Sequence, residues 1–291
     1  MDAAERDLLA DALRKTMTAA TGPELDAALE GLGWHDMLAE IPEQAVPLVF
    51  RLLGETGAHA PLINDVLRHA AGFPTGGTLL LPCAGGAWLV WERDGRPGTG
   101  IDPELPLHTA ADDDPTALNV QLPPAALAAG RRALGWWLLG SGRAMLALAR
   151  QHVLDRAQFG RSLASFQAVR HRLAETLVAL DGAEAALLTA GESADAATGP
   201  LEASDRRPDD YSDDELAALL GKAAAGQAAL TAARHCQQLL GGIGFTTEHD
   251  FHRHVRRVLA LDTLLGSTRE LTREAGAHAR REGRGRRLVE L

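Results

Sequence analysis

The chain has 291 residues, of which 46% are hydrophobic and 23% charged, a balance typical of globular proteins that excludes a mainly disordered chain. Lys and Arg number 29 against 39 Asp and Glu, and the resulting net charge of −10 argues against nucleic-acid binding. No apolar run approaches the roughly 20 residues that span a bilayer, the start is unlike a signal peptide, and two cysteines without metal-binding spacing predict a cytoplasmic protein that binds neither membrane nor metal.

Residues 1–72 are predicted to form an N-terminal helical domain. Apolar residues recur at helical spacing over residues 7–17, and a second helix over residues 24–34 follows Pro23. Two more helices are expected over residues 45–72, separated near Gly57 and Pro61.

Residues 73–122 are predicted to form a reduced β module, because Gly and Pro separate short apolar runs there. Strands are expected over residues 78–82, 87–92 and 118–122, with a loop over residues 93–115. Trp88 and Trp91 are expected to pack within this small sheet.

Residues 123–291 are predicted to form a bundle of antiparallel helices, which makes the fold mainly α. Its helices are expected over about residues 125–154, 165–190 and 212–240, with a last helix after Ser267. Ser212 and Glu215 have the spacing of a capping box. Residues 191–210 are expected to be an exposed linker, and the basic tail over residues 280–291 a solvated terminus.

Two segments of this region have residues suited to an anionic ligand. Residues 156–160 (Arg-Ala-Gln-Phe-Gly) offer a guanidinium fork for phosphate, and the amides of the helix starting near Ser165 add anion affinity. The glycines of residues 238–245 let a ligand approach the backbone. The same residues also fit a plain helix end with a glycine cap and a surface arginine, and composition alone leaves both readings open.

The order and spacing of these segments resemble the acyl-CoA dehydrogenase family. The resemblance rests on ALARQHVLDRAQFGRSLASFQAVRHRLAE and QQLLGGIGFTTEHDFHRHVRRV; it covers residues 125–280, is weaker over residues 1–72 and is poor over residues 73–122. It implies a helical N-terminal domain, a middle β domain and a C-terminal four-helix bundle, with FAD between the β domain and the bundle.

The resemblance also implies roles for individual residues. Arg156, Gln158 and Phe159 would face the pyrophosphate and adenosine of a neighbouring subunit's FAD, and Gln238, Gly241 and Gly242 would line the same pocket. Ser267 keeps the hydroxyl of a family threonine, whereas Arg269 replaces a flavin-contacting glutamine. Phe166 and Gln167 are expected to pack in the bundle, and His171 to be structural or solvated.

The catalytic base that the family's reaction requires is missing. Leu265 occupies the usual position of the family's glutamate, and Gly130 occupies the alternative position on the first long helix. Asp262 and Glu248 are the other carboxylates considered, and both are expected to be solvated or salt-bridged surface residues. No catalytic residue is therefore assigned to this chain.

Three hypotheses follow. In the first, the chain is the degenerate subunit of an α2β2 acyl-CoA dehydrogenase, similar to short actinobacterial members associated with steroid degradation, and a full-length partner supplies the base and the acyl-CoA pocket. The resemblance implies an electron-transfer flavoprotein as electron acceptor. In the second, the chain is a homo-oligomeric flavoenzyme with altered chemistry. In the third, it is a non-enzymatic binding or scaffold protein.

Overall fold

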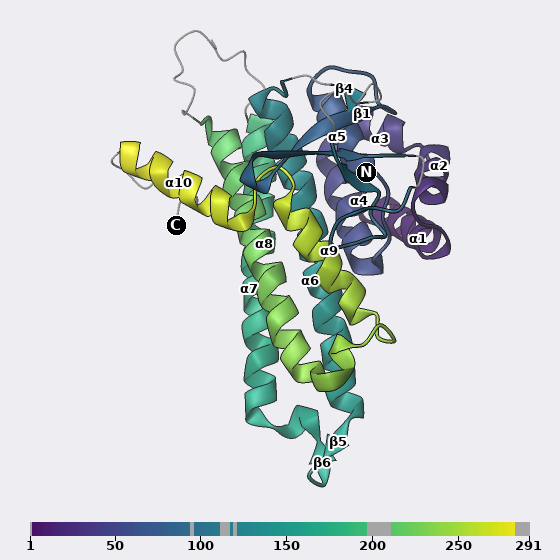
Figure 1. The fold of residues 1–291 in the computed structure, drawn as a ribbon, viewed down its shortest axis with the longest axis vertical. Helices are drawn as coiled ribbons and strands as arrows, with labels where there is room; N and C mark the ends of the chain where they lie inside the picture. The colour runs from purple at the N-terminus through teal and green to yellow at the C-terminus, as the bar shows by residue number, and fades with distance from the viewer. Residues whose placement is uncertain (1, 94–95, 111–116, 119–120, 197–210, 283–291) are drawn as a thin grey trace.

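Long helices run side by side and form the main axis of the molecule in the computed structural model (Figure 1). The structure describes residues 2–93, 96–110, 117–118, 121–196 and 211–282. The helices of the bundle are α6 (Pro124–Asp155), α7 (Gln167–Ala196), α8 (Asp213–Leu240) and α9 (Phe251–Thr263). The last helix, α10 (Thr268–Glu282), leaves the bundle near the start of α8 (Figure 1). The predicted mainly helical architecture is confirmed, whereas most of the expected linker and tail lie outside the described residues.

Helix α8 lies at the centre of the bundle, packed against α6, α7 and α9. Its start is the predicted capping box: the Ser212 hydroxyl accepts from the Glu215 amide at 3.2 Å, and the Ser212 amide donates to Glu215 Oε2 at 2.9 Å. It ends at Gly241, whose φ is +62°. By length and composition alone, Asp213–Phe245 could cross a membrane, but 67% of its apolar window is buried, as expected for a core helix.

Five helices precede the sheet and flank one end of the bundle (Figure 1). They are α1 (Ala3–Ala19), α2 (Pro23–Gly31), α3 (Trp34–Glu40), α4 (Pro42–Thr56) and α5 (Leu62–Ala70). The expected helix over residues 24–34 is in fact interrupted, because Gly33 adopts φ +84° and starts α3 in a new direction. The expected break after α4 is confirmed at Gly57, where φ is +70°.

Helices α4 and α6 cross at two glycines that allow the backbones to touch. A Cβ atom on Gly54 would lie 2.3 Å from the Trp137 carbonyl oxygen, and one on Gly140 would lie 2.1 Å from the Arg51 carbonyl oxygen. Because backbone atoms fill the space on both sides, neither position accepts a side chain unless the helices separate.

The sheet has the strand order β3-β2-β1-β4. Its strands are β1 (Thr78–Cys83), β2 (Ala87–Trp91), β3 (Leu107–Thr109) and β4 (Ala117–Leu118). Strand β3 pairs antiparallel with β2, so the expected loop over residues 93–115 is wrong at residues 107–109. The expected third strand is confirmed at Leu118, where β4 pairs parallel with β1; residues 119–120 lie outside the described residues, and residues 121–122 are not in a strand.

An aromatic chain joins the sheet to the helices. The rings of Trp34 and Phe50 are 6.2 Å apart, those of Phe50 and Trp137 5.7 Å, and those of Trp137 and Trp91 5.6 Å. Trp91 is therefore buried against α6 rather than within the sheet alone. Trp88 lies on β2 as expected and pairs with Pro82 of β1, but 47% of the residue is exposed.

Candidate functional site

The two positions where a catalytic carboxylate is expected face each other across an apolar contact. Leu265 follows α9 and is only 2% exposed. A Cβ atom on Gly130 of α6 would lie 2.6 Å from Leu265 Cδ1 and 2.6 Å from Leu67 Cδ2. The contact is filled by alkyl groups, which cannot accept a proton.

Strand β1 is hydrogen-bonded directly to the turn that carries Leu265. The Leu265 amide donates to the Pro82 carbonyl at 2.8 Å, and Cys83 and Leu264 form an isolated antiparallel bridge. On the other side, Arg131 Nε of α6 donates to the Leu265 carbonyl at 3.2 Å. The φ of Leu265 is +55°, which is unusual for a bulky residue, and these contacts hold it in that conformation.

The Asp262 carboxylate accepts hydrogen bonds from the first residue of α10. It accepts from the Thr268 amide at 3.2 Å and from the Thr268 hydroxyl at 2.5 Å. The expectation that Asp262 is a solvated or salt-bridged surface residue is therefore wrong, because it caps a helix. Glu248 is exposed and lies in the segment between α8 and α9.

The buried Lys222 of α8 stabilises the turn that carries Leu265. Lys222 Nζ of α8 donates to the Gly266 carbonyl at 2.6 Å and to the Asp262 carbonyl at 3.0 Å. Complete burial lowers the pKa of Lys222 to about 8, and the nearby Asp262 charge opposes this shift. Lys222 therefore positions the backbone that joins α9 to α10.

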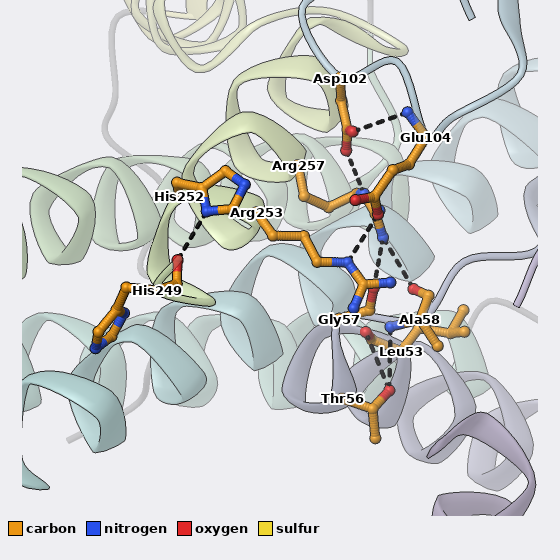
Figure 2. Close-up of polar contacts among 10 residues, drawn as sticks. All are labelled: Leu53, Thr56, Gly57, Ala58, Asp102, Glu104, His249, His252, Arg253 and Arg257. Carbon is orange, nitrogen blue, oxygen red and sulfur yellow. Dashed lines mark hydrogen bonds and ion pairs between the residues drawn. The ribbon is translucent and has the colours of Figure 1, made fainter. Parts of the chain in front are cut away.

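A buried ion-pair network joins α9 to the segment before β3 and to the end of α4 (Figure 2). Arg257 Nε donates to Asp102 Oδ2 at 2.5 Å, and its Nη1 donates to the Gly57 and Ala58 carbonyls at 3.0 Å each. Glu104 accepts from Arg257 Nη2 at 3.1 Å and from Arg253 Nε at 2.7 Å. The network therefore fixes the segment between β2 and β3 against α9 of the bundle.

Electrostatics within this network fix several protonation states. Burial opposes ionisation of Glu104, but the hydrogen bond and charge of Arg253, with the charge of Arg257, lower its pKa below the ordinary value. Burial and the Arg257 charge lower the pKa of His59 to about 3 and that of His254 to about 4. Both imidazoles are therefore neutral at physiological pH.

At the opposite end of the bundle, residues 156–162 form a projecting hairpin (Figure 1). Strand β5 (Ala157–Gln158) pairs with β6 (Arg161–Ser162). Phe159 and Gly160 both have positive φ, +55° and +76°, the pattern of a type I′ turn. The Phe159 side chain is 88% exposed, and Arg156 and Gln158 are exposed as well.

Contacts with the start of α7 hold this hairpin in place. The Phe159 and Phe166 rings are 6.2 Å apart, and the Arg161 guanidinium lies 4.1 Å from the Phe166 centroid. Phe166 therefore packs on the hairpin rather than in the bundle. The expectation for Gln167 is also wrong, because it is exposed and lies 3.4 Å from the exposed His171.

The Gly-Gly turn after α8 lies at the same end of the bundle (Figure 1). It belongs to the 3-10 helix η4 (Gly241–Phe245). A Cβ atom on Gly241 or Gly242 would meet nothing within 4 Å, so the backbone there is open to approach. Gln238 is exposed on the preceding turn of α8.

A hollow of about 390 Å³ lies between the end of α6 and the segment that follows η4. Its lining residues are Leu148, Gln151, His152, Asp155, Arg156 and His249. Partial burial, His249 and Arg156 lower the pKa of His152, whereas Asp155 opposes this shift. The hollow therefore brings a guanidinium and two imidazoles together.

Ser267 is separated from the other predicted cofactor residues. Its amide and hydroxyl both donate to Glu270 Oε2, at 3.0 and 2.9 Å, at the start of α10. This turn is held by Lys222, which lies sixteen positions before Gln238 on α8. That spacing corresponds to about 24 Å of helix. Arg269 is exposed beside Ser267.

Sequence reasoning missed several residues of these sites. His152 and His249 share a hollow because the end of α6 lies beside the segment before α9. No local sequence pattern indicates that these two histidines lie close together. Lys222 is one of two lysines in the chain and stands in an alanine-rich helix, a signal that could have identified it.

Among the described residues, no group of three or more His, Cys, Asp or Glu is arranged to hold a metal ion.

The family model and the curated relatives that match this chain indicate the same family. The model of the acyl-CoA dehydrogenase C-terminal domain matches residues 122–280. Acyl-CoA dehydrogenase FadE34 of Mycobacterium tuberculosis is 31% identical over 241 residues, covering 78% of this chain and 31% of that protein. Acyl-CoA dehydrogenase IpdE2 of the same organism is 34% identical over 135 residues, covering 46% and 36%. The chain thus spans about a third of the length of these relatives.

Solved structures show the same fold. The Tcur3481-Tcur3483 steroid acyl-CoA dehydrogenase matches with a TM-score of 0.73 at 18% identity, over 96% of this chain and 99% of that chain. The ChsE4-ChsE5 complex from Mycobacterium tuberculosis matches with a TM-score of 0.62 at 16% identity, over 96% and 98%. With the family model covering more than half of its length, this chain belongs to the acyl-CoA dehydrogenase family.

Proposed function

We propose that this chain is the non-catalytic subunit of a two-component, FAD-dependent acyl-CoA dehydrogenase. It lacks the catalytic base and contributes contacts to the FAD of a larger partner subunit, which supplies the base and the acyl-CoA pocket. The observation that carries this proposal is the contrast between the two ends of the bundle. One end has an alkyl contact where a carboxylate is needed, and the other presents exposed ligand-binding groups.

The filled end argues against dehydrogenation by this chain alone. α,β-Dehydrogenation needs a carboxylate near the substrate's α-carbon. Leu265 and Gly130 occupy both family positions and contact each other. In addition, β1 is bonded to the Leu265 turn, and Trp91 stacks on Trp137, so the sheet contacts the bundle directly on this side.

The exposed end fits the ADP half of an FAD held mainly by another subunit. Arg156, Gln158 and the open Gly241-Gly242 backbone offer donors for a diphosphate. The hairpin that carries Arg156 and Gln158 projects from the end of the bundle, and both residues are exposed (Figure 1). When bound, FAD would accept the hydride from the acyl chain; Arg156 and Gln158 would only hold and orient it.

Apolar side chains beside these groups support a partner surface there. Phe159 is 88% exposed, Phe245 77% and Ile243 43%. Exposed aromatic residues gathered at one end of a molecule are typical of interaction sites. We propose that the occupant is the larger subunit, in an α2β2 assembly with two FAD.

The relatives suggest the substrate class. The solved homologues include one described as a steroid acyl-CoA dehydrogenase and one described as a ChsE4-ChsE5 complex. By analogy we propose an acyl-CoA thioester of steroid origin as the substrate of the complex, and an electron-transfer flavoprotein as its electron acceptor.

Native mass spectrometry of the chain purified from its own host tests the assembly. We expect two copies of this chain, two copies of a larger chain and two FAD. A homo-oligomer that carries one FAD per chain would overturn the proposal and support a self-sufficient flavoenzyme. A flavin-free chain without a partner would support the binding or scaffold protein.

The variant Arg156→Ala should release flavin from the complex. The loss of a charge-assisted contact corresponds to about 2 kcal/mol, or roughly a 30-fold weaker FAD affinity. Flavin absorbance per complex, measured after gel filtration, reports the change. Arg150→Ala is the matched control, because Arg150 is exposed on α6 but does not line the hollow. Full flavin retention by the Arg156 variant would contradict the proposed contact.

A further inference from the structure

We infer that His152 and His249 bind, together with Arg156, the diphosphate of the partner's FAD, so that flavin affinity increases as pH falls. This inference rests on the proposed function and assigns two residues and a pH dependence to the same site. It makes these histidines positioning residues for the cofactor rather than participants in the reaction.

The geometry places all three groups around one hollow. His152 lies in the last turn of α6, and Arg156 is the residue that caps this helix, its amide donating to the His152 carbonyl at 2.9 Å, so both side chains line the hollow. His249 comes from the segment between η4 and α9 and completes the lining from the other side. The hollow measures about 390 Å³, which is room for a diphosphate and part of its ribose.

Hydrogen bonds fix the donor that His249 offers. Its Nδ1 accepts the Phe251 amide at 3.1 Å, so in the neutral ring the proton resides on Nε2. The His249 carbonyl accepts from His252 Nδ1 at 2.7 Å, which holds the segment in place. Figure 2 shows the His249 ring directed away from the ion pairs of Arg253 and Arg257. Its Nε2–H is therefore available as a donor even when the ring is uncharged.

The charges around His152 explain why an anion would be taken up together with a proton. Partial burial, followed by the charges of His249 and Arg156, disfavours its protonated form, and the Asp155 carboxylate opposes this effect. Gln151 Nε2 donates to the Asp155 carboxylate at 2.8 Å and so occupies one of its oxygens. A diphosphate beside His152 would offset the positive charges and favour the protonated form of this ring.

The probe that tests the inference is ADP-ribose added to the purified full chain. Its diphosphate is a diester, as in FAD, and keeps a constant charge near neutral pH, so any pH dependence belongs to the protein. Between about pH 8 and pH 5.5 we expect at least a tenfold gain in affinity, the equivalent of one pKa unit. Calorimetry in buffers of different ionisation heat should show proton uptake on binding, which a merely structural role would not produce.

The double variant His152→Asn/His249→Asn should lose both the pH dependence and the proton uptake. Asparagine at 249 retains an oxygen near the position of Nδ1 to accept the Phe251 amide, so the start of α9 is preserved. His69→Asn is the matched control, because His69 is exposed at the end of α5 and does not line the hollow.

The possible outcomes separate this inference from the proposed function. A flat pH profile, unchanged behaviour of the double variant or no ADP-ribose binding at low pH would overturn the histidine assignment. If Arg156→Ala still releases FAD from the complex, the proposed function survives that failure. If flavin is retained by both Arg156→Ala and the double variant, both proposals fail.

Discussion

Replacing Arg257 with methionine should lower the free energy of unfolding by about 3–5 kcal/mol. The Arg257 side chain is 1% exposed and donates to Asp102, to Glu104 and to two carbonyls at the end of α4. Methionine fills much of the same volume but leaves the fully buried Asp102 carboxylate without its cationic partner, with the Glu104 amide at 3.2 Å as its remaining donor. Equilibrium unfolding in urea, followed by circular dichroism, measures the loss.

Two further variants isolate the reason for this loss. Arg253→Met should cost at most about 1 kcal/mol, because Arg253 is 31% exposed and bonds only Glu104 among the described acidic residues. Adding Asp102→Leu to Arg257→Met should recover part of the stability, because it removes the uncompensated charge. A loss below about 1 kcal/mol for Arg257→Met would show that the network does not clamp the β2–β3 connection.

Gly140→Ala should destabilise the chain by about 3 kcal/mol, although alanine is the better helix former. The new methyl group would lie 2.1 Å from the Arg51 carbonyl oxygen and 3.1 Å from the Glu55 amide nitrogen. Both atoms belong to the backbone of α4, so no rotamer change relieves the overlap and the helices must move apart. The melting temperature should fall accordingly.

The same substitution at Gly182 should have the opposite sign. Gly182 is exposed in the interior of α7, and a Cβ atom there would meet nothing within 4 Å. Gly182→Ala should therefore stabilise the chain by about 0.5–1 kcal/mol through lower backbone entropy in the unfolded state. Equal effects at the two positions would contradict the close crossing of α4 and α6.

Much of the helical architecture could be predicted because its signals are local. The Ser212–Glu215 capping box, the Gly57 break and the Gly241 stop each depend on a few neighbouring residues, and each is confirmed. Strand β3 escaped prediction because its three residues carry no alternation of their own. They become a strand by pairing with β2, and the Arg257 clamp on the preceding loop is invisible in local sequence.

The positions of the candidate site could be predicted from family resemblance, but the surroundings of individual side chains could not. Family resemblance located Leu265 and Gly130, and the structure brings these two distant positions into contact. It also located Arg156 and the Gly-Gly turn, which lie at one end of the bundle. Asp262 was misjudged because its partner, the Thr268 hydroxyl, belongs to the next helix, and a carboxylate's surroundings depend on such tertiary contacts.

The stacked indoles of Trp91 and Trp137 have a spectroscopic consequence. One ring belongs to the sheet and the other to α6, with centroids 5.6 Å apart and planes inclined by 27°. Electronic transitions of rings this close couple, and the coupling contributes a near-ultraviolet circular dichroism band that depends on their mutual orientation. This band therefore reports whether the sheet is packed against α6, and it requires neither flavin nor an added label.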